Sequence, residues 1–80
     1  MQQPLTPTEN RLVAYLLAKN ERPATPKELR EAIWGDEKSL AVVEKTINRL
    51  RKKIEPEPDR PRYLRNEYGE GYTLVLSPGD

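Results

Sequence analysis

A group of side chains that can hydrogen-bond nucleobases lies in the stretch AVVEKTINRLRKKIE, residues 41–55. Arginine and lysine donate to O6 and N7 of guanine, and asparagine pairs with N6 and N7 of adenine. Long cationic side chains also reach phosphate oxygens, which makes Lys53 a candidate for a backbone contact. The candidate base-contacting residues are Lys45, Asn48, Arg49, Arg51 and Lys52.

The apolar residues of the same stretch predict that it is a helix with one buried side. They recur at spacings of 4, 3 and 4, which is the period of an α-helix, at Val43, Ile47, Leu50 and Ile54. At about 100° per residue, the lysines and the asparagine lie opposite this stripe. Because a helix fits the DNA major groove, the sequence predicts a recognition helix over about residues 40–54. The alternative is a solvated surface helix whose cations stabilise its C-terminal end.

Two earlier helices share one starting pattern. In LTPTE, residues 5–9, and in ATPKE, residues 24–28, a threonine N-cap is followed by a proline at the first helical position. A glutamate three residues after the threonine completes a capping box. We therefore expect helices at about residues 7–19 and 26–34, joined by a short turn in KNERPA.

A hairpin is expected after the third helix. EPEPDRPR, residues 55–62, carries three prolines and predicts an extended loop. Tyrosines and leucines then flank GEG, whose glycines permit positive φ, so residues 63–76 predict a β-hairpin. Three helices followed by a hairpin predict an α+β winged helix-turn-helix fold, with the hairpin as the wing.

The wing and the end of the second helix add candidate DNA-backbone contacts. Near the hairpin these are Arg65, Asn66, Tyr68 and Tyr72, and at the end of the second helix Trp34. Two acidic residues near the hairpin tip, Glu67 and Glu70, favour the alternative, because carboxylates repel phosphates. In that alternative the tyrosines are ordinary cross-strand aromatics.

Composition limits the class of protein. The chain has 80 residues, a net charge of +1, and neither cysteine nor histidine. The usual catalytic nucleophile–base pairs and zinc ligands are therefore missing, and we expect no enzyme, no cofactor and no metal. No apolar run is long enough to span a membrane and no signal peptide opens the chain, so a cytoplasmic location is expected.

Four motifs resemble one known family, the winged-helix DNA-binding domains of OmpR/PhoB-type response regulators (transcriptional regulatory protein, C-terminal domain). They are LTPTE at residues 5–9, ELREAIWG at 28–35, INRLRKKIE at 47–55 and GEGYTL at 69–74. The resemblance covers residues 5–76. It implies binding to double-stranded DNA at direct-repeat promoter sites, as a tandem homodimer, within a two-component system that regulates transcription.

The resemblance also implies a role for individual residues. Base-facing positions of the family fall on Lys45, Asn48, Arg49 and Arg51, and the minor-groove position of the wing falls on Tyr68. Phosphate-contacting positions fall on Trp34, Val42, Thr46 and Tyr72.

The sequence departs from the family at several positions. The family often has arginine at Asn48 and commonly at Tyr68, and an Arg-Thr pair at 41–42 where this chain has alanine and valine. The link before the third helix is shorter than usual, and in the family this link often meets RNA polymerase, a candidate partner here.

The sequence leaves the organisation of the whole protein open. The family's N-terminal sheet and receiver domain are not in this chain, which is either one domain of a larger protein or a minimal regulator. Residues 1–4 and 77–80 are expected to be flexible termini. A second hypothesis for the domain at 5–76 is a winged-helix protein–protein interaction module with little or no DNA binding.

Overall fold

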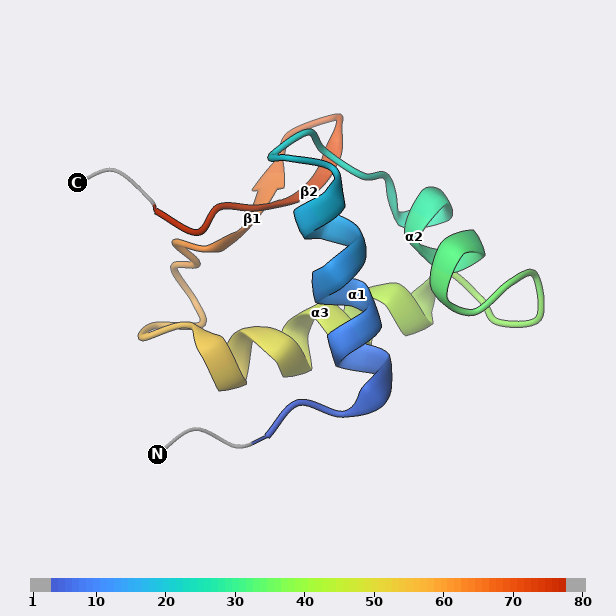
Figure 1. Ribbon diagram of the computed structural model, residues 1–80, viewed down its shortest axis with the longest axis horizontal. Coiled ribbons are helices and arrows are strands. Elements are labelled where there is room, and N and C mark those ends of the chain that lie inside the picture. The colour runs from blue at the N-terminus through green and yellow to red at the C-terminus, as the bar shows by residue number, and fades with distance from the viewer. Residues whose placement is uncertain (1–3, 78–80) are drawn as a thin grey trace.

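The structure is a computed structural model that describes residues 4–77 (Figure 1). It contains three helices and a two-stranded antiparallel hairpin, which confirms the predicted winged helix-turn-helix fold. The elements are α1 (Pro7–Ala18), α2 (Pro26–Ile33), α3 (Ala41–Ile54), β1 (Leu64–Glu67) and β2 (Gly71–Leu74). The termini predicted to be flexible lie outside the described residues, apart from residues 4 and 77. Within residues 4–77, no helix is both long and apolar enough to cross a membrane.

The first capping box forms as predicted. The backbone N–H of Glu9 donates to the Thr6 hydroxyl at 3.1 Å, and the Thr6 N–H donates to the Glu9 carboxylate at 2.9 Å. Two backbone donors that the helix itself leaves without partners are thereby satisfied. The start of α1 is therefore determined by residues next to one another in the sequence.

The second capping box forms only in part. The Glu28 N–H donates to the Thr25 hydroxyl at 3.0 Å, as expected. The Glu28 carboxylate, however, accepts hydrogen bonds from the Tyr15 hydroxyl at 2.6 Å and from Lys19 Nζ at 2.7 Å. Both partners belong to α1 or its C-cap, so this glutamate joins α2 to α1 rather than closing its own cap.

The hydrophobic core lies where the three helices meet the hairpin. The predicted stripe of α3 is confirmed, since Val43, Ile47 and Leu50 have no exposed surface and Ile54 is partly buried. Burying a leucine or isoleucine side chain contributes about 1.5–3 kcal/mol each. Side chains from the other elements complete this core: Leu12, Leu16, Ala24, Leu29, Ile33, Leu64 and Leu74.

The hairpin is held at its second edge by the link between α1 and α2. Ala24 and Tyr72 exchange two backbone hydrogen bonds, of 2.8 and 2.9 Å, as an isolated antiparallel bridge. The sequence predicted only a turn in this link. The backbones approach so closely that a Cβ on Gly71, which has φ +127°, would lie 2.2 Å from the Ala24 carbonyl oxygen. This contact requires glycine at position 71.

The proline-rich loop between α3 and β1 is organised by one buried carboxylate. Glu55, at the C-terminal end of α3, is 7% exposed. Its carboxylate accepts backbone N–H donors from Arg62, Tyr63 and Leu64 at 2.7 to 3.3 Å. Because Arg62 and Tyr63 immediately precede β1 and Leu64 is its first residue, these hydrogen bonds hold the start of the hairpin against the C-terminal end of α3.

Candidate nucleic-acid interface

The exposed face of α3 carries the central residues of the predicted interface. Lys45, Asn48, Arg49 and Lys52 are all exposed, while the stripe on the other side of the helix is buried. At about 100° per residue these four side chains fall within an arc of about 100°. No ion pair to Lys45 or Lys52 is present among residues 4–77. The helix therefore presents two lysines and an amide to solvent on one face.

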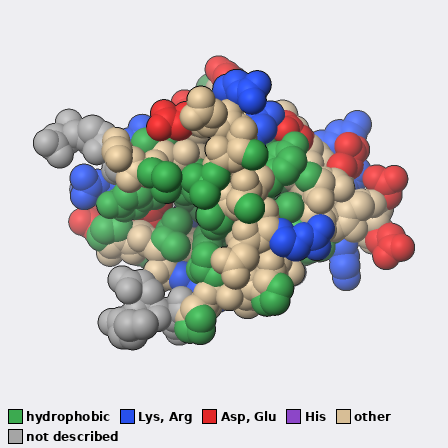
Figure 2. Space-filling view, in the orientation of Figure 1, with side chains coloured by type: hydrophobic (Ala, Val, Ile, Leu, Met, Phe, Trp, Pro, Cys, Tyr) green, Lys and Arg blue, Asp and Glu red, His purple; other side chains and the backbone are tan. Residues whose placement is uncertain are grey.

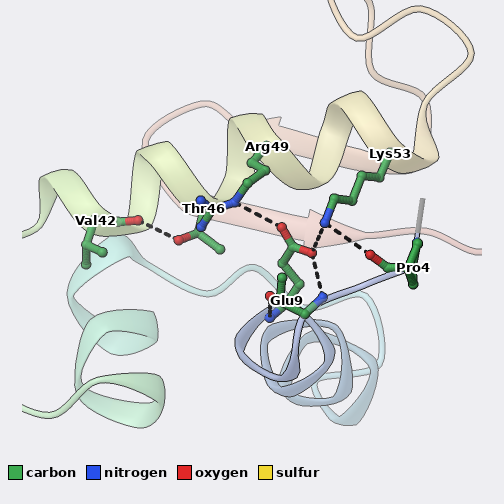
Figure 3. A network of polar contacts seen from close by, with 7 residues as sticks. Pro4, Glu9, Val42, Thr46, Arg49 and Lys53 are labelled. Carbon is green, nitrogen blue, oxygen red and sulfur yellow. Dashed lines mark hydrogen bonds and ion pairs between the residues drawn. The ribbon is translucent and has the colours of Figure 1, made fainter. Parts of the chain in front are cut away.

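One edge of this face is bound to α1 through Glu9 (Figure 3). Arg49 Nε donates to the Glu9 carboxylate at 3.0 Å, and Lys53 Nζ donates to it at 2.7 Å. Lys53 Nζ also donates to the Pro4 carbonyl oxygen at 3.2 Å. The Glu9 side chain has no exposed surface, so its charge is neutralised by two cations from α3.

The contacts of Glu9 change its acidity. Burial raises the pKa of this carboxyl, but hydrogen bonds from Lys53, the Thr6 N–H and Arg49 stabilise the ionised form more strongly. The net result is a pKa below the ordinary value of 4.5. Glu9 is therefore an anion at neutral pH, and the two cations beside it are fixed by charge as well as by geometry.

Arg49 and Lys53 differ in how much of the side chain remains exposed to solvent. The Arg49 side chain is 57% exposed although its Nε is bonded, so part of its guanidinium faces solvent. Lys53 is only 10% exposed on its side chain, and its ammonium group is already bonded to two acceptors. Arg49 therefore remains available to contact DNA, whereas Lys53 does not.

Thr46 was predicted to contact a phosphate, but its position in the structure prevents this. Its side chain is in the core at 1% exposure, and its hydroxyl donates to the Val42 carbonyl oxygen at 2.8 Å (Figure 3). A phosphate has no access to a hydroxyl in this position. The sequence did not reveal this, because Thr46 lies between the buried and exposed sides of the helix.

The other edge of the exposed face is bound to the hairpin through Arg51. Arg51 Nε donates to the Leu64 carbonyl oxygen at 3.0 Å, and its Nη2 donates to Asn66 Oδ1 at 2.7 Å. Its guanidinium carbon lies 5.9 Å from the centre of the Tyr72 ring. The structure thus brings together three predicted contact residues, Arg51, Asn66 and Tyr72, in one group between α3 and the wing.

The remaining predicted residues lie around this group. Tyr68, in the turn of the hairpin, is fully exposed, while Arg65 on β1 is half-buried and donates to the Arg62 carbonyl oxygen at 2.9 Å. Burial raises the pKa of Tyr72 above 10.0, and Glu44 raises it further while Arg51 lowers it. Trp34, the C-cap of α2, is half-buried against the core.

The sequence reasoning missed the acidic partner of the basic helix. Glu9 carries a local signal, since a glutamate at the third position of a helix after threonine predicts a capping box. Nothing in that pattern indicates that the same carboxylate also binds Arg49 and Lys53, which lie 40 and 44 residues further along the chain.

The arrangement defines a class of protein. Three helices, a third helix whose exposed face is basic, and a hairpin beside that face are the features of winged helix-turn-helix DNA-binding domains of transcription regulators. The profile of the family described as "Transcriptional regulatory protein, C terminal" matches residues 2–74. The chain belongs to this family, which comprises transcription regulators rather than enzymes.

Known regulators resemble the chain in sequence and in structure. RpaA of Synechocystis sp., a DNA-binding dual master transcriptional regulator, is 36% identical over 75 residues, which are 91% of this chain and 31% of RpaA. The response regulator DrrB of Thermotoga maritima, an OmpR/PhoB homologue, matches with a TM-score of 0.81 and 37% identity, over 90% of this chain and 33% of DrrB.

A second similar structure was solved as a complex. The DNA-binding domain of the response regulator AdeR, solved in complex with an intercistronic region, matches with a TM-score of 0.74 and 28% identity. The match covers 89% of this chain and 71% of that domain. The chain thus spans about a third of the length of RpaA and of DrrB.

Proposed function

We propose that this chain binds double-stranded DNA sequence-specifically as part of a bacterial transcription regulator, with α3 in the major groove. The observation that carries this proposal is the exposed face of α3 opposite a stripe in which Val43, Ile47 and Leu50 have no exposed surface. A helix with this division offers its polar side to a groove while its apolar side stays in the core. The similar DNA-binding domain of AdeR was solved in complex with an intercistronic region, which supports DNA binding by this chain.

The proposed base contacts follow from exposure. Base contacts come from Asn48, whose amide can pair with adenine, and from the cations beside it, Lys45, Arg49 and Lys52. Backbone and wing contacts come from Trp34, Arg65, Asn66, Tyr68 and Tyr72. The binding activity is proposed to involve no catalysis and to take place in the cytoplasm.

Two further partners are proposed from the family resemblance. A tandem homodimer on direct-repeat DNA would place two copies of α3 in successive major grooves, so repeat spacing should follow the helical turn of about 10 base pairs. RNA polymerase would meet the exposed link between α2 and α3, residues 36–40. We propose that residues 5–76 form one DNA-binding domain. Whether it binds either partner depends also on any further domains of the protein.

Selection of bound duplexes from a random pool tests the proposed function. We expect one enriched motif, and an affinity for it that falls steeply with salt, because each neutralised phosphate contributes about −0.9 to the slope of log K against log salt. Unrelated duplexes serve as competitors. No enrichment together with no salt dependence would contradict the proposal, whereas salt-dependent binding without a motif would indicate non-specific binding.

A protein-interaction module remains the second candidate function, and one surface favours it. An apolar hollow of about 490 Å³ lies between α1, the end of α3 and the hairpin. Figure 2 shows hydrophobic side chains gathered in the middle of this face. Ile54, which lines the hollow, lies about 180° around α3 from Lys45, so this surface and the basic face point in opposite directions.

The chemistry of the rim indicates the kind of partner. Pro56 lines both the apolar hollow and a neighbouring hollow of about 270 Å³, which also contains Arg60, Arg62 and Glu57. The matching partner is a protein segment with apolar side chains next to carboxylates. Binding of such a peptide that is abolished by Leu76→Asp and unaffected by Lys45→Glu would support this function, and no binding at all would exclude it.

A further inference from the structure

Arg51 holds both strands of the wing from its position on α3. Its two hydrogen bonds go to β1, at the Leu64 carbonyl oxygen and the Asn66 side chain, and its guanidinium lies against Tyr72 of β2. Asn66 and Tyr72 are directly opposite each other in the hairpin register. One guanidinium therefore meets a cross-strand pair and fixes the angle between hairpin and helix.

The direction of Arg51 differs from that of the exposed face. At about 100° per residue, Arg51 lies about 120° around α3 from Lys45, on the side of the helix that faces the hairpin. It is half-buried, whereas Lys45, Asn48 and Lys52 are exposed. To reach a base edge, Arg51 would have to give up both hydrogen bonds to β1.

Arginine suits this position because of its shape. A planar guanidinium donates in two directions at once and stacks on an aromatic ring, whereas a lysine ammonium is a point charge on a flexible stem. The far edge of the hairpin is already bound through Tyr72 to Ala24. With Arg51 on one side and Ala24 on the other, the base of the wing is fixed at two places, and its tip carries the fully exposed Tyr68.

We propose that Arg51 is a positioning residue that sets the wing against α3, so that Tyr68 and the basic face contact one duplex together. This replaces the base-contacting role that the sequence predicted for Arg51. The proposal rests on the proposed function, since it names how two parts of the same DNA interface are coupled. Its specific consequence is that Arg51 affects DNA binding only through the wing.

A double-mutant cycle separates positioning from direct contact. Tyr68→Ala should weaken binding to the selected duplex about tenfold and Arg51→Ala at least about tenfold, but adding Tyr68→Ala to Arg51→Ala, whose misplaced wing has already lost the Tyr68 contact, should cost less than about twofold more. Effects that multiply to about a hundredfold would overturn the proposal. As the matched control, the losses of affinity in Lys45→Ala and Tyr68→Ala should multiply in the double variant, because Lys45 does not touch the wing.

A measurement without DNA keeps the test independent of DNA binding. Residual dipolar couplings of the free chain should report one orientation for helices and hairpin in the wild type, and a changed hairpin orientation in Arg51→Lys and Asn66→Ala. An unchanged orientation in both variants would overturn the proposal. If the wild type binds no duplex, the proposed function fails, while these couplings still decide whether Arg51 positions the wing.

Discussion

Glu9 on α1 and Lys53 on α3 are joined by an ion pair of 2.7 Å around a carboxylate with no exposed surface. The same carboxylate caps α1 through the Thr6 N–H and accepts a second bond from Arg49. A single glutamate therefore caps the start of α1 and anchors α3 against that helix. Since α3 carries the proposed DNA contacts, its position depends on this anion.

Glu9→Gln should destabilise the fold while preserving the shape of the side chain. The substitution leaves two cations beside a neutral amide, and breaking a buried pair in this way costs about 3–5 kcal/mol of the free energy of unfolding. Urea unfolding monitored by circular dichroism measures the change. Glu31→Gln is the control, because Glu31 is about half exposed in its 3.6 Å pair with Arg30 and should cost less than about 0.5 kcal/mol. Equal losses in the two variants would contradict this role of Glu9.

Stability should fall in acid because two carboxyl groups have lowered pKa values in the folded state. Hydrogen bonds from Lys19 and Tyr15 lower the pKa of Glu28 below 4.5, and the cations around Glu9 lower its pKa despite burial. Their stabilisation is fully present above pH about 4.5 and is lost as the pH falls through the folded values.

Unfolding free energies between pH 7 and pH 3 test this dependence. The double variant Glu9→Gln/Glu28→Gln should lose a smaller free energy over this range than the wild type, because neither amide titrates. A dependence as steep as that of the wild type would assign the acid sensitivity to other carboxyl groups.

Gly71→Ala should disrupt the attachment of the wing to the link between α1 and α2. The new Cβ would lie 2.2 Å from the Ala24 carbonyl oxygen, and the backbone there has φ +127°. We expect a loss of about 3 kcal/mol or more, measured by thermal unfolding. Gly69→Ala is the matched control, since φ is +76° but nothing lies within 4 Å. Gly69→Ala should cost only about 1 kcal/mol. A comparable loss in both variants would mean that position 71 needs glycine for its backbone conformation and not for the contact with Ala24.

Two adjacent lysines should behave differently. Lys52→Ala removes an exposed cation and should lower affinity for DNA while reducing the salt slope by about 0.9, with stability unchanged. Lys53→Ala removes a partner of Glu9 and should lower the free energy of unfolding by about 1–3 kcal/mol, with the salt slope unchanged. Affinity measured at several salt concentrations, next to urea unfolding, separates the two. A reduced salt slope in Lys53→Ala would return Lys53 to the DNA interface.

Asn48→Ala should relax base preference rather than remove binding. Its amide is exposed on the basic face, and a bidentate contact to adenine discriminates by about 1–3 kcal/mol. Competition between the selected duplex and duplexes altered at one base pair measures the change. Asn10→Ala, at an exposed asparagine of α1, should leave discrimination as it is. Unaltered preference in Asn48→Ala would place Asn48 outside the base contacts.

The local elements were predictable because their causes lie within a few residues of each other. Thr6 and Glu9 are three positions apart, and the buried stripe of α3 repeats every three or four residues. Gly69 has the positive φ that a tight hairpin turn requires. Helix, turn and wing follow from such short-range rules, and so does the division of α3 into a buried and an exposed side.

Only the tertiary structure decided which cations of α3 remain free. Five basic residues lie between positions 45 and 53 in the sequence, yet Glu9 binds two of them and the hairpin binds a third, Arg51. These partners come from segments at least 13 residues away, which no periodic pattern connects. The physical reason is that helical spacing sets the direction of a side chain, while packing between elements sets which charge it meets there.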